Sequence, residues 1–292
     1  REELAERTAW TENVVKTFLP EESGTQKEIM EAMNYSVMAG GKRLRPLLMH
    51  ETYRMFGGTG RVILPLMAAI EMVHTYSLVH DDLPAMDNDQ YRRGKLTTHA
   101  KYGHAMGVLA GDALLNHAFE TAAEAFDKST DLRRTAKALQ ILSRKAGIYG
   151  MIGGQVVDVQ STGRAVDQEK LDFIYELKTG ALLEASMMIG AVLAGAEEKQ
   201  LKKAEEMASA IGLAFQIQDD ILDVTSTEEQ LGKPVLSDEK NHKTTYVTLK
   251  GIDQARSDVA EISERAVSLL HEIPGSNPFL ENLIYMLINR EN

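Results

Sequence analysis

The sequence contains no cysteine, which excludes both a disulfide framework and a metal site built on thiolates. It also lacks the unbroken apolar run of roughly 18 to 20 residues that a membrane span requires. Its first ten residues, REELAERTAW, are charged where a secretory signal would be apolar. We therefore expect a cytoplasmic protein that does not insert stably into a membrane.

Positive charge is in short supply. The chain has 32 Lys and Arg against 43 Asp and Glu, a net charge of -11, which argues against nucleic acid or an anionic membrane as the main partner. Alternating strand patterns are almost absent, whereas apolar residues recur at helical spacing between Gly and Pro breaks. The sequence therefore predicts an all-α fold.

Length and apolar content allow one large core. With 292 residues, 43% of them hydrophobic, and no repeat or linker, we predict a single domain over residues 1–292. The expected helices, of which the last should break between Pro274 and Pro278, lie near 2–18, 24–39, 44–56, 62–82, 99–126, 131–150, 167–193, 199–225, 241–249 and 253–290.

Aspartates gather at the ends of two apolar helical segments. They occur in HDDLPAMDND, as Asp81, Asp82, Asp87 and Asp89, and in FQIQDDILD, as Asp219, Asp220 and Asp223. Carboxylates at the edge of a core are costly to desolvate unless a cation meets them. A divalent metal is the natural candidate, and because Pro84 ends the first helix, we expect Asp87 to turn back towards Asp81.

Several loops are basic although the chain is acidic overall. Their cations are Arg92, Arg93, Lys178, Lys233, Lys243, Lys42 and Arg45. Lys and Arg side chains pair with phosphate oxygens, Arg through a two-pronged fork. Magnesium prefers oxygen ligands and is commonly shared between one or two carboxylates and substrate phosphates. The sequence therefore indicates a polyanionic, phosphorylated substrate bound with Mg²⁺.

The motifs occur in a recognisable order. They are GGKRLRP at 40, DDLPAMDND at 81, RRG at 92, GGQVVD at 153, KTG at 178, FQIQDDILD at 215 and GK at 232. In this order they resemble the short-chain trans-polyprenyl diphosphate synthase family, most closely its bacterial farnesyl diphosphate synthases. The resemblance implies an isoprenoid synthase fold of about ten or more helices around a deep central cavity, in a homodimer. It also implies two facing Asp-rich motifs and three Mg²⁺ ions.

The resemblance also implies a role for each motif residue. The metal ligands would be Asp81, Asp87 and Asp219, supported by Asp82 and Asp223, and Asp220 would belong to the same catalytic group. The allylic diphosphate would bind to Arg92, Lys178, Thr179, Gln216, Lys233 and Lys243. Isopentenyl diphosphate would bind to Gly41, Lys42, Arg45, His74 and Arg93. Gln155 and Asp158 are interpreted as partners of other side chains, and the Gly of KTG permits a local helix distortion.

The implied reaction is a head-to-tail condensation. An allylic diphosphate, first dimethylallyl and then geranyl, loses its diphosphate with the help of Mg²⁺, and isopentenyl diphosphate attacks the resulting cation to give (2E,6E)-farnesyl diphosphate. Tyr76 lies five residues before Asp81, about 7.5 Å along a helix, with Ser77 beside it. Either could limit product length, and we expect the Tyr76 ring to floor the pocket.

Other functions remain open at this point. Geranylgeranyl diphosphate synthases share every catalytic motif. A di-iron carboxylate bundle would use Glu-x-x-His pairs, which occur at Glu71 to His74 and Glu239 to His242. A terpene cyclase would not need the GGKRLRP loop, and a non-catalytic partner subunit would be expected to lack part of one Asp cluster. Iron content and consumption of isopentenyl diphosphate distinguish these possibilities.

Overall fold

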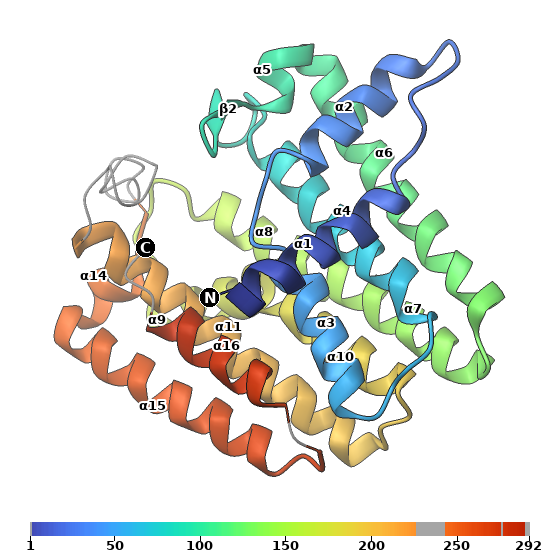
Figure 1. The fold of residues 1–292 in the computed structure, drawn as a ribbon. Coiled ribbons are helices and arrows are strands. Elements are labelled where there is room, and N and C mark those ends of the chain that lie inside the picture. Colours follow the sequence, from blue (N-terminus) through green and yellow to red (C-terminus); the bar gives the residue numbers. More distant parts are fainter. Residues whose placement is uncertain (1, 226–242, 276, 290–292) are drawn as a thin grey trace. The chain divides into compact units, whose positions relative to one another are not determined.

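The computed structural model describes residues 2–225, 243–275 and 277–289. Its chain divides into two compact units, one of Arg1–His50 with Gly60–Leu139 and one of Glu51–Thr59 with Gln140–Asn292. Nearly all of the ordered structure is helical (Figure 1), which confirms the all-α prediction. The expectation of one domain stays a prediction.

The first unit contains the N-terminal helices. They are α1 (Glu2–Thr17), α2 (Lys27–Val37), the start of α3 (Leu44–Met55), α4 (Ile63–Asp81), α5 (Thr98–Tyr102), α6 (His104–Ala123), the 3₁₀ turn η1 (Glu124–Lys128) and the start of α7 (Leu132–Ala146). A short antiparallel hairpin joins β1 (Tyr91–Arg92) to β2 (Lys95–Leu96). The hairpin follows the first Asp cluster directly.

Helix α4 is the core of this unit. Apolar residues surround most of it, and it packs along α6, as Figure 1 shows. The close approach depends on Gly111, since a Cβ atom there would lie 2.1 Å from Nε2 of His80. By length and composition, α4 is the one described helix that could cross a bilayer, but 72% of the relevant window is buried inside the structure. Such burial is typical of a core helix.

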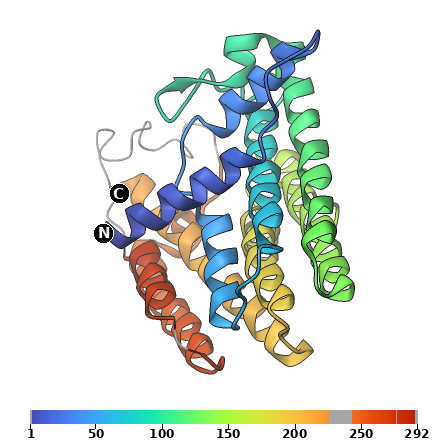
Figure 2. The ribbon, with the colours of Figure 1, turned by 45° about the vertical axis from the view of Figure 1, so that its right-hand side comes forward.

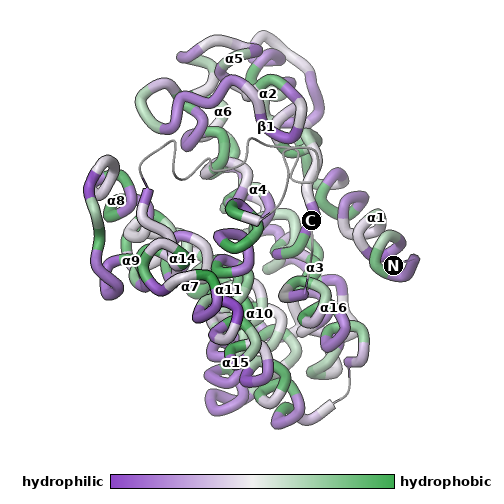
Figure 3. Tube along the Cα trace, turned by 90° about the vertical axis from the view of Figure 1, so that its left-hand side faces the viewer, coloured by the Kyte–Doolittle hydropathy of each residue, from purple (hydrophilic) through white to green (hydrophobic). Residues whose placement is uncertain are grey.

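The second unit contains the remaining helices. They are α8 (Met151–Gln160), α9 (Gln168–Ile174), the π-helical turn η2 (Tyr175–Gly180), α10 (Ala181–Leu193), α11 (Glu198–Thr225), α14 (Tyr246–Lys250), α15 (Ile252–His271) and α16 (Pro278–Ile288). Every residue of α10 is buried. Helix α11 packs against α10 and α15, and α16 lies along α15 (Figure 2). Polar and apolar residues alternate along α15 in Figure 3, as expected for a helix with one buried side.

Two expected helices differ from the observed ones, and one observed helix was not expected. The segment 99–126 is interrupted at Gly103, whose φ of +94° separates α5 from α6. The segment 167–193 contains the π-helical turn η2 at the KTG motif, which confirms the expected distortion. Helix α8 occupies a segment between 150 and 167 for which no helix range was expected.

Candidate active site

The first Asp cluster forms a closed turn at the end of α4. The amide of Asp87 donates to the carbonyl of Asp81 at 2.8 Å, and the amide of Asp89 donates to the carbonyl of Asp82 at 3.1 Å. The chain therefore returns on itself after Pro84, as the sequence predicts. Asp81 is half-buried and Asp87 is exposed, so both carboxylates remain accessible to solvent.

Asp82 has a different position from its neighbours. It is buried and accepts a forked pair of hydrogen bonds from Arg92, at 2.9 Å from Nε and 2.7 Å from Nη2. Burial would lower the pKa of Arg92, but the hydrogen bond to Asp82 and the charges of Asp81 and Asp89 raise it instead. The guanidinium expected to bind diphosphate is thus held against the Asp-rich turn, where it also offsets the repulsion among the carboxylates.

A small basic pocket lies beside α4. It contains His74 and Arg93, two of the residues expected to bind isopentenyl diphosphate, together with Gly40, Glu71 and Arg92. Burial lowers the pKa of His74 well below its ordinary value, and the nearby charges of Arg45, Arg93, Arg92 and Arg43 lower it further. His74 is therefore neutral at pH 7 and can donate a single N–H to an anion.

Arg93 in this pocket and Arg45, whose charge acts on His74, have unusual surroundings. Burial lowers the pKa of Arg45 to about 10, and its Nε atom has no hydrogen-bond partner among the described residues. Arg93 donates to the carbonyl of Gly40, and a Cβ atom at Gly41 would lie 2.7 Å from Nη1 of Arg93. The remaining cavity is only about 30 Å³, which is smaller than a diphosphate group.

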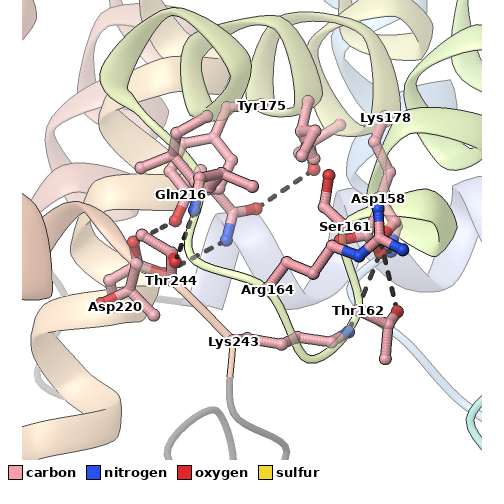
Figure 4. Close-up of a pocket in the computed structure, with 15 residues that line it drawn as sticks. Asp158, Ser161, Thr162, Arg164, Tyr175, Lys178, Gln216, Asp220, Lys243 and Thr244 are labelled. Carbon is pink, nitrogen blue, oxygen red and sulfur yellow. Dashed lines mark hydrogen bonds and ion pairs between the residues drawn. The ribbon is translucent and has the colours of Figure 1, made fainter.

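The second unit has its own cationic cavity, shown in Figure 4. Its volume is about 210 Å³, and it lies between α8, α9, the η2 turn, α11 and the segment before α14. Five of the residues predicted from the sequence line it, namely Lys178, Thr179, Gln216, Asp220 and Lys243. The structure therefore brings together most of the expected allylic-diphosphate residues of this unit.

Asp158 links the two lysines of the cavity. Its carboxylate lies 2.6 Å from Nζ of Lys178 and 3.8 Å from Nζ of Lys243, and the side chains converge in Figure 4. The η2 turn that carries Lys178 packs closely on α8, because a Cβ atom at Gly154 would lie 2.4 Å from the backbone nitrogen of Lys178. Asp158 thus acts as a partner of other side chains, as predicted, and it neutralises cations suited to phosphate.

Polar groups on η2 and α11 meet on the other wall. Thr179 donates to Oε1 of Gln216 at 3.1 Å. Asp220 is buried and accepts hydrogen bonds from the Tyr175 hydroxyl and, at 2.9 Å, from the Tyr246 amide. It therefore fastens η2 and the start of α14 to α11.

The other aspartates of the second cluster lie outside this cavity's lining. Asp219 is half-buried and Asp223 is buried, both on the continuous helix α11. Among the described residues, no group of three or more His, Asp or Glu side chains is arranged to hold a metal ion by protein ligands alone. The metal assignment of Asp81, Asp87 and Asp219 stays a prediction.

The residues considered for product length are on α4. Tyr76 is buried, and its ring meets the His80 ring edge-on with centroids 5.7 Å apart. Burial and the charge of Asp81 raise the pKa of Tyr76 to about 12. The Ser77 hydroxyl donates to the carbonyl of His74 at 2.6 Å. Neither residue lines the small basic pocket, and their role in product length stays a prediction.

Two cationic residues of these pockets were not among the predicted site residues. Arg43 is buried and donates to Glu71, which lines the basic pocket, and the exposed Arg164 lines the cavity of the second unit. Their positive charge and their position in Gly-containing loops could have indicated both residues. Arg43, however, lies between Lys42 and Arg45, which were the predicted phosphate ligands of that loop. Lys233 and the pair Glu239 to His242 lie outside the described residues.

This all-helical chain with cationic pockets and two Asp clusters has clear relatives. The polyprenyl synthetase family model matches residues 26–271. The chain is 43% identical over 257 residues to the farnesyl diphosphate synthase of Geobacillus stearothermophilus, covering 88% of this chain and 86% of that protein. It is 41% identical over 290 residues to the geranylgeranyl diphosphate synthase of Cyanophora paradoxa, covering 99% and 96%.

A solved structure gives the same result. The geranyltransferase of Helicobacter pylori, complexed with magnesium and isoprenyl diphosphate, superposes with a TM-score of 0.84 at 31% identity over 99% of this chain and 96% of that one. The chain belongs to the polyprenyl synthetase family. It is accordingly a prenyltransferase with the isoprenoid synthase fold that the motifs predicted.

Proposed function

We propose that this prenyltransferase condenses isopentenyl diphosphate with dimethylallyl diphosphate and then with geranyl diphosphate, to give (2E,6E)-farnesyl diphosphate. The observation that carries the proposal is the presence of two separate cationic pockets. One surrounds His74 in the first unit and the other surrounds Lys178 in the second. Two pockets for diphosphates suit a reaction in which one diphosphate leaves and the other is retained.

The donor chemistry of the Asp clusters fits Mg²⁺. Asp81 and Asp87 are accessible carboxylates brought together by a closed turn, and Mg²⁺ takes few protein oxygens because waters and substrate phosphates supply the rest. We propose that Asp81, Asp87 and Asp219 hold three Mg²⁺ ions when the allylic diphosphate is bound. Bound Mg²⁺ would neutralise the charge that develops on the leaving diphosphate.

The side chains around the second cavity suit departure of the allylic diphosphate. Lys178 and Lys243 are partly buried cations, so they can stabilise negative charge that grows as the C1–O bond breaks. Thr179 and Gln216 present oxygen dipoles on the same wall, where they can face the allylic cation.

The basic pocket of the first unit suits a diphosphate that must stay intact. His74 is neutral and surrounded by arginines, and the pocket contains no more than the two carboxylates Glu71 and Asp82, each bound to an arginine. An isopentenyl diphosphate held there keeps its C–O bond while its double bond attacks the cation. The adduct then loses a proton, for which the released pyrophosphate is the proposed acceptor.

Product length is the finer part of the proposal. The buried Tyr76 ring, one to two turns before Asp81 on α4, supports a C15 product. Geranylgeranyl diphosphate synthase is the second candidate, because a relative of that name is 41% identical over nearly the whole chain. Replacing Tyr76 with Ala should lengthen the product if the ring limits the pocket, whereas Tyr76→Phe should leave it unchanged.

Sizing the reaction products tests this proposal. The protein is incubated with Mg²⁺, dimethylallyl diphosphate and excess labelled isopentenyl diphosphate, and the dephosphorylated products are separated by chain length. We expect C15 as the end product from wild type and C20 or longer from Tyr76→Ala. A C20 product from wild type would favour the second candidate, and unchanged C15 from Tyr76→Ala would remove Tyr76 as the floor.

The remaining assignments are also proposals. We propose a cytoplasmic homodimer that acts on small diphosphates and has neither nucleic acid nor a stably inserted membrane segment as a partner. The net charge of -11 supports the exclusion of polyanionic surfaces. Light scattering coupled to size-exclusion chromatography measures the oligomeric state directly, and a mass near 32.3 kDa would contradict the homodimer.

A further inference from the structure

Arg43 is the most completely buried cation of the basic loop GGKRLRP. It is 2% exposed, although arginines are rarely buried unless paired. Its Nη1 donates to Oε1 of Glu71 at 2.9 Å, and its Nη2 donates to Oε1 of Glu12 at 3.2 Å and to the carbonyl of Val37 at 2.7 Å. One guanidinium therefore joins the loop to α4, α1 and α2.

The backbone at Arg43 is as unusual as its side chain. Its φ is +49°, in the left-handed region that a residue other than glycine enters only at a cost of about 1 kcal/mol or more. The buried hydrogen bonds of the side chain offset that cost. The Arg43 carbonyl also accepts the amide of Leu47 at 3.1 Å, so the same residue begins α3.

This anchoring bears directly on the basic pocket. Lys42 precedes Arg43 and Arg45 follows it by two residues, so their directions depend on the backbone that Arg43 fixes. Glu71, which binds Arg43, lies three residues before His74 on α4, so the anchor and the pocket share one helix face. The charge of Glu71 also raises the pKa values of Arg45 and Arg93 against the effect of burial.

We propose that Arg43 is a positioning residue of the isopentenyl diphosphate pocket. It binds Glu71 and Glu12, and so holds residues 40–45 in the conformation from which Lys42 and Arg45 reach the diphosphate. We place it outside contact with the substrate, because its side chain is only 1% exposed and both Nη atoms donate to protein acceptors, while its buried Nε has no partner among the described residues. The inference rests on the proposed function of the pocket.

The test separates positioning from a purely structural role. Arg43→Lys keeps the charge but cannot bridge three acceptors with a planar fork, and Arg43→Gln removes the charge. The matched control is Arg54→Gln on α3, where the exposed guanidinium lies 3.9 Å from Glu51. Isothermal calorimetry measures isopentenyl diphosphate binding without metal or allylic substrate, and steady-state kinetics gives KM for each substrate and kcat.

We expect Arg43→Lys to weaken isopentenyl diphosphate binding and to raise its KM by about tenfold, since a small displacement of binding groups has effects of this size. The KM for the allylic diphosphate and kcat at saturation should change by less than about twofold. Arg54→Gln should match wild type. If Arg43 served only to stabilise the loop, Arg43→Lys would lower the melting temperature and leave both KM values unchanged.

Two results would overturn the inference. Arg43→Lys, folded by circular dichroism, could bind isopentenyl diphosphate as wild type does, or it could raise both KM values equally. Should Arg43→Gln fail to fold, Arg43→Lys alone decides. A wild-type protein that neither binds isopentenyl diphosphate nor incorporates it would overturn the proposed function itself, which the binding measurement distinguishes from a failure at Arg43.

Discussion

Replacing Lys145 with Met should destabilise the second unit severely. Nζ of Lys145 lies 2.5 Å from Glu184 and 2.8 Å from Glu205, and the Glu184 side chain is only 5% exposed. Met preserves the length of the side chain but removes the cation, which leaves a buried carboxylate without its partner. Breaking such a pair costs about 3 to 5 kcal/mol, so we expect a loss of about 3 kcal/mol in the free energy of unfolding at pH 8.

The pH dependence gives the same prediction a second check. Burial raises the pKa of Glu184 even though Lys145 opposes the shift. A carboxyl with a raised pKa in the folded state contributes stability that is fully present below its unfolded pKa, about 4.3, and is lost as the pH rises through the folded pKa. The loss in free energy of unfolding caused by Lys145→Met should therefore be smallest near pH 5 and increase towards pH 8.

Urea unfolding at pH 5 and pH 8, followed by circular dichroism, measures both effects. The control is Lys203→Met, because Lys203 pairs with Glu272 at 3.0 Å through side chains that are 26% and 55% exposed. A pair this exposed contributes about 0.5 kcal/mol. If Lys145→Met costs no more than Lys203→Met at either pH, the buried pair does not stabilise the unit as the structure indicates.

Three further predictions concern the site. Asp81→Ala and Asp219→Ala should lower kcat by orders of magnitude. The melting temperature of the metal-free protein should stay nearly unchanged, since each substitution removes one of several repelling carboxylates. A large fall in that temperature would contradict this prediction. Gly154→Ala should cost about 1 to 3 kcal/mol in urea unfolding, because its Cβ would lie 2.4 Å from the backbone nitrogen of the η2 turn, and wild-type stability would refute the close packing. The side chain of Arg164 makes no hydrogen bond or ion pair with another described residue, so Arg164→Gln should raise KM for the allylic diphosphate about tenfold if it donates to phosphate, whereas Lys170→Gln, outside the cavity, should not.

The helices were predictable where apolar periodicity was long and uninterrupted. The expected helix 62–82 is observed as Ile63–Asp81, and 199–225 is observed as Glu198–Thr225. The expected helix ranges were wrong at two glycine-containing segments. The expected helix ranges left out α8, in which Gly154 allows close packing on η2. At Gly103 a positive φ breaks a helix that the apolar pattern would continue, and the pattern contains no information about backbone dihedrals.

The motif residues were predictable as a set, but their partners were not. The sequence indicated that Arg92 and Lys178 would meet phosphate, and in the structure they bind Asp82 and Asp158. Such pairings depend on which side chains the fold brings within about 3 Å, which spacing along the chain cannot specify. For the same reason nothing in GGKRLRP separated the anchoring Arg43 from its neighbours.

In the proposed mechanism the two diphosphates are held in two different ways. Calorimetric titration of isopentenyl diphosphate and of a non-ionising allylic diphosphate analogue, each with Mg²⁺ and with EDTA, tests it directly. We predict that isopentenyl diphosphate binds equally well in EDTA, because its pocket relies on arginines and His74. The allylic analogue should bind tightly only with Mg²⁺. Loss of isopentenyl diphosphate binding in EDTA, or metal-independent tight binding of the analogue, would contradict the claim.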